Sequence, residues 1–502
     1  MSMPIPMSYT PPHGYSELPQ HHKPYTFVQT PGFSSQGYRT IRPAYSPAVS
    51  RPRGSQPSAS HGSHPSMSHP HGSYLSVSQP LGSQPLRRVV IQIHVPVFLF
   101  YPLKSIVADP SEISIIDERL EQSLCKLLTH IYPAAGRFAA NDNSHSVDCL
   151  DQGVTYIKAK INCQFDDFIK AALKDIDLAL KFCPDMVRDA SNSPLVVVQV
   201  TKFNCGGLAL TISTSHSAMD GFTESKFLYE WAKVSKMGTS EKDINCFTFD
   251  LGTIFPASDH SSKILKSSSS SIRKPREIAM VAKRFVINES AISSLRDKLG
   301  FKPTRVEMVI SLLWRALINA SQQRNGRLRP CLLIISMNLR GKIDFPRYKS
   351  SFGNFAIDVP VKFIPGGAET KMELQDFIIL LKDTIQKKSL LFAKASTCDL
   401  FSMVGKFHDE IQQWEDNDEV DVFMVSSLCS FPVYEIDFGW GKLFLTSFGL
   451  RRSDMFWLHK TECGTGIVVQ ADLKQSDMEM FECDQDVLAF TCKYGVPLKS
   501  FL

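Results

Sequence analysis

The sequence lacks paired cysteines: its 12 cysteines stand singly, and no two of them form a Cys-x-x-Cys pair. They occur in settings such as Leu124-Cys125-Lys126 and Phe203-Asn204-Cys205, without a repeated spacing. A disulfide framework or a zinc site of cysteine pairs is therefore excluded as the organising feature of the fold. Reduced and mostly buried thiols of this kind indicate a cytoplasmic protein.

The sequence also lacks a long hydrophobic run. The longest apolar stretch, from Val89 to Tyr101, contains Gln92, His94 and Pro96 and is too short to span a bilayer. The amino terminus shows no charged segment followed by an apolar one, which a secretory signal would need. We therefore expect no membrane partner.

Little net charge of either sign lies outside the amino-terminal segment. The formal net charge is +5 over 502 residues, but residues 1–88 hold seven Lys or Arg and a single acid, Glu17. The rest of the chain is therefore nearly neutral, and its charge does not favour a nucleic-acid partner. Hydrophobic residues at 43% and charged residues at 21% are typical of a globular protein.

Several familiar catalytic motifs are missing. The chain has no G-x-S-x-G, no G-x-x-x-x-G-K-[ST] and no H-E-x-x-H, and Gly464-x-Gly466 lacks the third glycine of a dinucleotide-binding fingerprint. Seven histidines lie outside the first 85 residues, without a spacing typical of metal ligands: His94, His130, His145, His216, His260, His408 and His459. We therefore expect neither a metal site nor a resident cofactor.

Two stretches of biased composition divide the chain. Residues 1–85 hold 15 of the 30 prolines and half of the 14 histidines, with a degenerate repeat of the type GSQPSAS. Such a segment buries too little apolar surface to offset the entropy of ordering it, so we expect a disordered tail over 1–88, with histidines that are more often incidental than metal ligands. A Ser-rich, basic stretch over 236–284 predicts a crossover linker between an amino-terminal domain at 89–235 and a carboxyl-terminal domain at 285–502.

Hydrophobic periodicity predicts alternating helices and strands in both expected domains. In the first domain a helix is expected at 116–131, and strands at 89–101, 154–161, 195–201 and 207–213. In the second domain a helix is expected at 305–320, and strands at 332–337, 422–426 and 466–470. This alternation is typical of an α/β or α+β fold with a mixed sheet in each domain.

The first candidate for chemistry is the segment Ser215-His216-Ser217-Ala218-Met219-Asp220-Gly221. It follows the strand expected at 207–213 and precedes a helix, so a rigid strand would aim His216 while a loop exposes it. Because the chain holds 14 His and 50 acidic residues, a His followed four residues later by an acid is expected by chance alone. On spacing alone, a His packed at the end of a strand is the better explanation.

The second candidate, Asp437-Phe438-Gly439-Trp440-Gly441, interleaves two glycines with two aromatic residues. Glycines permit a tight backbone, and the rings on either side can anchor it. Taken by itself, this pattern also fits a turn that aromatic packing stabilises.

Together the two segments resemble the plant BAHD acyltransferases, a family defined by HxxxD near the middle of the chain and DFGWG near its carboxyl end. Five further stretches resemble family patterns in the same order: Tyr132–Arg137 (YPAAGR), Phe203–Gly207 (FNCGG), Pro303–Glu307 (PTRVE), Asn338–Arg340 (NLR) and Phe352–Asn354 (FGN). The resemblance runs from about residue 89 to residue 500 and is greatest to the vinorine synthase-like branch.

The resemblance implies two chloramphenicol-acetyltransferase-like domains with mixed sheets and an active-site channel between them. It implies acyl transfer from an acyl-CoA thioester, with acetyl-CoA expected, to a hydroxyl of a plant specialised metabolite such as an alkaloid or terpenoid alcohol. Acyl-CoA is then a co-substrate in a ternary complex with a small-molecule acceptor, and the protein is expected to be a monomer. Two alternatives stay open: an acylsugar or amine acyltransferase, and a non-catalytic BAHD-like binding protein.

The resemblance also assigns roles to particular residues. His216 is expected to be the general base, a role that suits an imidazole, and Asp437 is placed with it in the catalytic set. Ser426 is the candidate donor to the oxyanion. Support of the site is expected from Asp220, Arg340, Gly439 and Trp440.

Asp220 is expected to form an ion pair with Arg340 and to leave His216 free. A carboxylate at the start of a helix is favoured by the helix dipole, and a buried carboxylate needs a cation. The chain departs from the family at Leu428, where a Trp is usual. It departs again near the amino terminus, where Ile41-Arg42-Pro43 is the sole counterpart of the family's opening segment.

Overall fold

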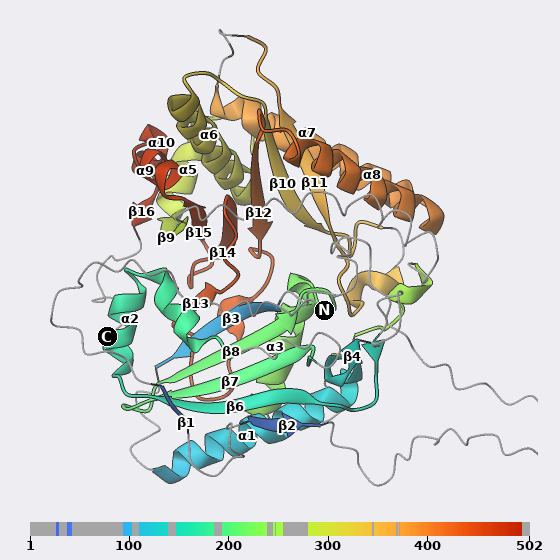
Figure 1. Ribbon diagram of the computed structural model, residues 1–502, viewed down its shortest axis with the longest axis vertical. Helices are drawn as coiled ribbons and strands as arrows, with labels where there is room; N and C mark the ends of the chain where they lie inside the picture. The colour runs from blue at the N-terminus through green and yellow to red at the C-terminus, as the bar shows by residue number, and fades with distance from the viewer. Residues whose placement is uncertain are drawn as a thin grey trace, which may run out of the picture.

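The protein is built from two seven-stranded sheets, one above the other in Figure 1, each flanked by helices. This computed structural model describes residues 27–29, 38–42, 94–102, 110–138, 147–184, 193–237, 244–245, 247–254, 280–343, 346–367, 370 and 372–493. The expected mixed α/β fold with a sheet in each half is confirmed.

The first sheet has the strand order β1-β6-β7-β8-β3-β13, and β2 also pairs with β6. Strands β6 and β7 run parallel, whereas the other neighbours are antiparallel, so the sheet is mixed. The strands are β1 (Phe27–Gln29), β2 (Tyr38–Ile41), β3 (His94–Tyr101), β6 (Val154–Ile161), β7 (Val196–Phe203), β8 (Leu208–Ser215) and β13 (Leu445–Phe448). A separate two-stranded sheet joins β4 (Arg137–Phe138) to β5 (Val147–Asp148).

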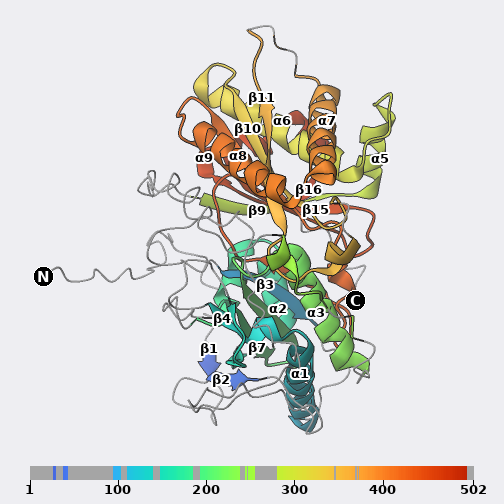
Figure 2. The ribbon, with the colours of Figure 1, turned by 90° about the vertical axis from the view of Figure 1, so that its right-hand side faces the viewer.

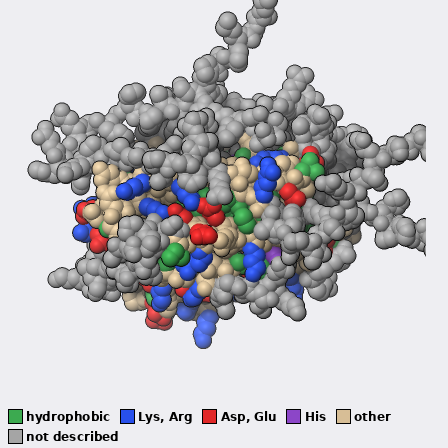
Figure 3. All heavy atoms as spheres, turned by 90° about the horizontal axis from the view of Figure 1, so that it is seen from below, with side chains coloured by type: hydrophobic (Ala, Val, Ile, Leu, Met, Phe, Trp, Pro, Cys, Tyr) green, Lys and Arg blue, Asp and Glu red, His purple; other side chains and the backbone are tan. Residues whose placement is uncertain are grey.

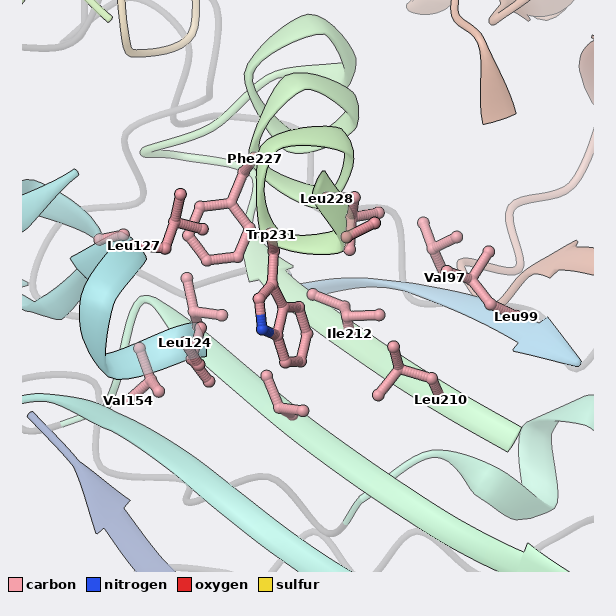
Figure 4. Close-up of a cluster of buried hydrophobic side chains, with 14 of the residues drawn as sticks. Val97, Leu99, Leu124, Leu127, Val154, Leu210, Ile212, Phe227, Leu228 and Trp231 are labelled. Carbon is pink, nitrogen blue, oxygen red and sulfur yellow. The ribbon is translucent and has the colours of Figure 1, made fainter. Parts of the chain in front are cut away.

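Helices cover both faces of the first sheet. They are α1 (Pro110–His130), α2 (Phe165–Ala172) and α3 (Gly221–Met237), with the short 3₁₀ helices η1 (Tyr132–Ala135) and η2 (Ile176–Phe182). The 3₁₀ helix η4 (Leu251–Thr253) packs instead in a core of the second half. Helices α1 and α3 pack together on one face, where Trp231 is fully buried beside Leu124 and Ile212 (Figure 4). On the other face, α2 and η2 bury a cluster of phenylalanines that includes Phe100 and Phe168, with ring centroids 5.3 Å apart.

The second sheet has the strand order β11-β10-β12-β14-β15-β9-β16. Its strands are β9 (Met280–Ile287), β10 (Cys331–Asn338), β11 (Ala356–Phe363), β12 (Asp421–Ser427), β14 (Met455–Lys460), β15 (Ile467–Lys474) and β16 (Cys492–Lys493). Its helices are α5 (Glu289–Asp297), α6 (Arg305–Asn325), α7 (Leu374–Lys394), α8 (Thr397–Glu415), α9 (Gln475–Glu482) and α10 (Gln485–Phe490), with the 3₁₀ helix η5 (Pro346–Ser350). The 3₁₀ helix η6 (Val433–Glu435) packs instead against α3 in the first core. The capping box of Thr304 and Glu307 starts α6, which is the most buried helix of this half.

One strand crosses between the halves. After β12 the chain leaves the second sheet, adds β13 to the edge of the first sheet against β3, and returns as β14. The side chain of Gln470 on β15 holds the backbone of Phe448 on β13, donating to its carbonyl at 3.1 Å and accepting from its amide at 3.3 Å. The domain division at 89–235 and 285–502 stays a prediction, but β13 shows that the second segment completes the first sheet.

The amino-terminal segment differs from the disordered tail that the sequence predicts over 1–88. Residues Tyr38–Ile41 form β2, and Ile41 is buried in the first core. The close approach is possible because Gly153 (φ 85°) lies directly beneath: a Cβ there would be 2.4 Å from the carbonyl oxygen of Ile41. The rest of the expected tail, apart from β1 and Arg42, and most of the expected linker at 236–284 lie outside the described residues.

Two views turned from Figure 1 complete the description. Figure 2 shows α1 and α3 on the same side of the first sheet, with the second sheet above. Figure 3 shows the lower face of the molecule, on which basic and acidic side chains are interspersed. Within the described ranges, no helix has the length and apolar character needed to cross a bilayer.

Candidate active site

His216 lies in a tight turn between β8 and α3. The amides of Ala218 and Met219 both donate to the carbonyl of Ser215, at 2.9 and 3.0 Å, and so close the turn. His216 is exposed, whereas the residues on either side of it are buried. The backbone carbonyl of His216 accepts a hydrogen bond from the side chain of Asn354, at 3.0 Å. The turn therefore presents an exposed imidazole on a backbone that the second half holds in place.

Asp220 is turned into the protein and is 3% exposed. Its carboxylate accepts from Arg340 Nη1 at 2.6 Å, from the amide of Phe355 at 2.8 Å and from the amide of Thr223 at 2.9 Å. The last of these bonds caps the start of α3. The ion pair expected between Asp220 and Arg340 is thus confirmed, and no contact among the described residues joins Asp220 to the ring of His216.

Arg340 follows β10 and ties the turn to the second half. Its guanidinium donates to the carbonyls of Ser351 and Gly353, at 3.0 and 2.9 Å, in addition to Asp220. It also lies over the ring of Phe222, 4.4 Å from the centroid. Because all these partners surround a guanidinium that is almost completely buried, removal of either charge would leave the other without a partner.

The segment at the end of β12 approaches the start of α3. A Cβ placed on Gly221 would be 3.0 Å from Leu428 Cδ2 and 3.4 Å from Phe431 Cε2. Ser426 is the next-to-last residue of β12, is half-buried, and pairs in register with Trp457 of β14. The structure therefore places the oxyanion candidate on the segment that borders the His216 turn.

A cavity of about 310 Å³ lies on the other side of the same segment. It is lined by Thr304, Arg305, Val306, Ser427, Cys429, Ser430, Lys460 and Ile467. Two of these side chains are basic, and one of them, Arg305, is oriented by bonds to the carbonyls of Gly464 and Thr465 at 2.8 and 2.6 Å. Ser427 and Cys429 thus line the basic cavity, whereas Leu428 between them reaches Gly221 at the start of α3.

The DFGWG segment lies at the opposite end of α3. Asp437 accepts from Lys236 Nζ at 2.6 Å, and Lys236 belongs to the last turn of the helix. A helix of 17 residues is about 25 Å long, so the structure does not bring Asp437 together with His216. The catalytic role expected for Asp437 stays a prediction, and its place at the carboxyl end of α3 does not favour it.

The geometry of this segment is that of an anchored turn. Partial burial opposes ionisation of Asp437, but hydrogen bonds from Lys236 and from the amide of Gly439 keep its pKa below the ordinary value. Gly439 and Gly441 have φ values of 99° and 135°, which other residues rarely adopt. Phe438 and Trp440 stack with centroids 5.1 Å apart. Gly439 therefore lies beside the carboxyl end of α3, where a Cβ placed on it would be 3.1 Å from Lys236 Cα, and Trp440 anchors the same turn.

Two other histidines of the described residues have a lowered pKa: His459 is buried, and His94 is half-buried. Burial lowers the pKa of His94 to about 4, although a bond to the carbonyl of Ser213 opposes the shift. Burial likewise lowers the pKa of His459 to about 4. Within the described parts of the chain, no three His, Cys, Asp or Glu side chains are grouped so that they could hold a metal ion.

Sequence reasoning missed some of the residues that shape the turn. Thr223 donates through its hydroxyl to the carbonyl of Gly353 at 2.8 Å and accepts from Arg340 at 3.2 Å. The aromatic ring of Phe355 lies 5.6 Å from the Arg340 guanidinium. The F-G-N stretch was visible in the sequence, but its amide contact with His216 depends on the approach of the two halves.

Several known proteins with similar sequences carry the name acetyltransferase. The profile of the Transferase family matches residues 85–488. Salutaridinol 7-O-acetyltransferase of Papaver somniferum is 32% identical over 437 residues, which cover 78% of this chain and 89% of that enzyme. Acetyl-CoA-benzylalcohol acetyltransferase of Clarkia breweri is 28% identical over 437 residues, covering 81% of this chain and 93% of that enzyme.

Solved structures show the same fold. Vinorine synthase aligns with a TM-score of 0.70 and 22% identity, covering 94% of this chain and all of that one. F. sporotrichioides TRI101, complexed with coenzyme A and T-2, aligns with a TM-score of 0.60 and 16% identity, covering 83% and 99% of the two chains. With the family profile, the 32% identity and the HxxxD and DFGWG segments in place, the chain belongs to the Transferase family, the BAHD acyl-CoA-dependent acyltransferases of plants.

Proposed function

We propose that this protein transfers an acyl group, with acetyl expected, from acyl-CoA to a hydroxyl of a plant specialised metabolite such as an alkaloid or terpenoid alcohol. The observation that carries the proposal is the division of roles in the turn: His216 is exposed while Asp220 is buried and neutralised by Arg340. An imidazole without a carboxylate partner can take up a proton and release it again within one turnover.

The reaction needs one general base. A thioester is already activated, so His216 removes the proton from the acceptor hydroxyl as its oxygen attacks the carbonyl carbon. The C–S bond of the tetrahedral intermediate then breaks, and the proton passes from His216 to the sulfur of the departing CoA. General-base assistance of this kind is worth about 10²–10⁴-fold in rate.

The developing oxyanion needs a hydrogen-bond donor, and we assign this role to the hydroxyl of Ser426. Support comes from its place on the β12 segment that borders the His216 turn. Loss of one such donor typically costs about 10²–10³-fold in kcat. The next residue, Ser427, lines the basic cavity, so the segment offers hydroxyls on both sides.

The basic cavity suits the acyl-CoA co-substrate. CoA carries phosphates, and Arg305 and Lys460 supply positive charge beside Thr304, which caps the amino terminus of α6. Phosphate groups are favoured by such helix ends and by basic side chains. The thioester would then approach His216 past Leu428, from the side opposite to the acceptor.

The remaining parts of the proposal concern the setting of the enzyme. We assign Asp437 to the stability of its own turn, and we propose a cytoplasmic monomer without a resident cofactor or metal. The ten cysteines that the structure describes are all free thiols, which suits a reducing compartment.

The direct test is to incubate the purified protein with acetyl-CoA and a panel of alcohols, sugars and amines, and to follow the release of free CoA thiol. Thiol release that depends on an alcohol acceptor supports the proposal, and release that depends on a sugar or an amine supports the alternative acceptor classes. An inert protein that still binds CoA would be a binding protein. His216→Gln, which keeps the approximate size of the side chain, serves as the control for background hydrolysis.

A further inference from the structure

A buried acid in the first turns of α3 has no part in the chemistry described so far. Glu224 is 8% exposed. Three, four and seven residues later, Phe227, Leu228 and Trp231 lie in the first core (Figure 4). Glu224 therefore occupies the apolar face of an amphipathic helix, where an acid is expected only with a partner.

The partner is a threonine of the neighbouring strand. Thr214 on β8 is 1% exposed and donates through its hydroxyl to Glu224 Oε1, at 3.0 Å. Thr214 stands two residues before His216, and Glu224 stands eight residues after it. The bond thus joins the end of β8 to the start of α3. It closes the His216 turn on the side that faces the first core, which we call the inner side.

The turn is closed from its outer side by the second half. Asp220 and Thr223, both one turn or less before Glu224, are held by Arg340 and the carbonyl of Gly353. The two sets of bonds hold the same short segment from opposite directions. The outer set fixes the turn relative to the second half, and the inner set fixes it relative to the strand.

We propose that Glu224, as a neutral carboxyl hydrogen-bonded to Thr214, is a positioning residue that holds the His216 turn in its reactive place. The proposal rests on the general-base role of His216 proposed above. It adds a residue that touches neither substrate and acts on the reaction through the backbone of the turn.

The surroundings explain why the carboxyl is neutral. Burial raises the pKa of Glu224 to about 8; the bond from Thr214 lowers it, and the charge of Asp220 raises it. Asp220 is the charge that acts on Glu224, and Arg340 balances it on the far side. Of the other elements packed against α3, α1 ends at His130 and η6 carries Glu435.

Ionisation of Glu224 would oppose the closed turn. A second negative charge would lie one helical turn from Asp220, and like charges at this spacing repel each other. Because the pKa is raised, the carboxyl is neutral below about pH 8 and loses its proton above it. The turn should therefore loosen, and turnover should fall, on the alkaline side.

The experiment compares wild type with Glu224→Gln and Glu224→Leu, measuring kcat and the KM of acetyl-CoA from pH 6 to 9.5. Gln keeps an oxygen for Thr214 and cannot ionise, so its kcat should stay level where that of wild type falls by about tenfold, a loss expected from a small misplacement of the base. Leu removes the bond, and its kcat should be about tenfold lower at every pH with an unchanged KM for acetyl-CoA.

Substitutions at the partner give an independent comparison. Thr214→Val keeps the shape and removes the hydroxyl, so it should reproduce the low kcat of Glu224→Leu, and Thr214→Ser should restore it. Glu230→Gln is the matched control: Glu230 is a buried acid of the same helix, six residues after Glu224, and accepts from the amide of Asn245 at 3.1 Å. It should retain the alkaline decline of wild type.

A spectroscopic measurement separates this proposal from the proposed function. The ring ¹³C signal of His216, assigned with His216→Gln, should shift near pH 8 in wild type and not in Glu224→Gln, whether or not an acceptor is turned over. If kcat falls at alkaline pH, and the His216 ¹³C signal shifts, in the same way in wild type and in Glu224→Gln, the positioning role of Glu224 is wrong. If the His216 signal shifts near pH 8 in wild type and not in Glu224→Gln, but the protein shows no transfer that depends on His216, the positioning role of Glu224 stands and the proposed acyltransferase function is wrong.

Discussion

Helix α3 carries a sequence motif at each end, and the two ends differ in kind. At its amino end a polar turn exposes His216 and buries an ion pair between Asp220 and Arg340. At its carboxyl end Phe438 and Trp440 stack under a glycine turn, and Phe438 meets Trp231 edge to face at 5.0 Å. Both motifs stand out equally in the sequence, but only the amino end presents an exposed imidazole.

The two ends also offer matched ion pairs. Arg340 to Asp220 and Lys236 to Asp437 are both 2.6 Å long. The side chains of the first pair are 2% and 4% exposed, and those of the second are 51% and 28% exposed. The two ion pairs have the same length but contribute differently to the free energy of unfolding. Water screens the exposed pair, and it solvates either partner when the other is removed.

The largest effect is expected at the amino end from His216→Ala. Loss of the general base should lower kcat by about 10²–10⁴-fold while acetyl-CoA still binds. Steady-state kinetics and a separate measurement of CoA binding test this, with Asp437→Asn as the matched change at the other end. If Asp437→Asn caused the larger loss of turnover, the assignment of the two ends would be reversed.

Arg340→Met should cause the next largest effect. It leaves the carboxylate of Asp220 buried without a cation, which typically costs about 3–5 kcal/mol in the free energy of unfolding. Denaturant unfolding measures the loss, and kcat of the folded protein should fall as well because the His216 turn is released. A stable Arg340→Met protein with normal turnover would contradict the role of the ion pair.

Trp440→Ala should destabilise the protein without altering the chemistry. Trp440 is 5% exposed and stacks on Phe438, so its truncation should cost about 3 kcal/mol. The kcat per folded molecule should stay within about threefold of wild type. The reason is that contacts at the amino end of α3 position His216, whereas Trp440 lies at the carboxyl end. A loss of turnover comparable to that of His216→Ala would show that this end also serves the reaction.

Lys236→Met should have the smallest effect of the series. An exposed ion pair contributes about 0–1 kcal/mol, and its removal leaves Asp437 in contact with water and with the amide of Gly439. Thermal unfolding in parallel with Arg340→Met makes the comparison direct. Equal losses from the two substitutions would mean that burial does not distinguish the pairs.

Some of the fold and of the site could be predicted from the sequence because the signals are local. The strand expected at 154–161 coincides with β6. The helix expected at 116–131 ends one residue after α1, which begins earlier, at Pro110. The pairing of Asp220 with Arg340 was implied by the family resemblance and supported by a physical rule, since a buried carboxylate requires a cation. Hydrophobic periodicity is a property of a short segment and can therefore be recognised in the sequence.

Other features depend on which segments meet, and no local signal carries them. Strand β13 has four residues, too few for a periodic pattern, and its partner β3 lies more than 300 residues earlier in the chain. The burial of Glu224 depends on the approach of α3 to β8, and the sequence shows an ordinary helical acid. The cavity at Arg305 and Lys460 likewise joins residues from separate elements of the second half.

The exchange of β13 has a consequence for the order in which the chain folds during synthesis. Until residue 448 has left the ribosome, the first sheet ends at β3, whose edge is apolar and whose residues Phe98 and Phe100 are fully buried in the finished protein. An uncovered apolar strand edge is a template for aggregation. The nascent amino-terminal half should therefore need chaperone protection for most of translation, and the final strand of its sheet arrives only when the protein is nearly complete.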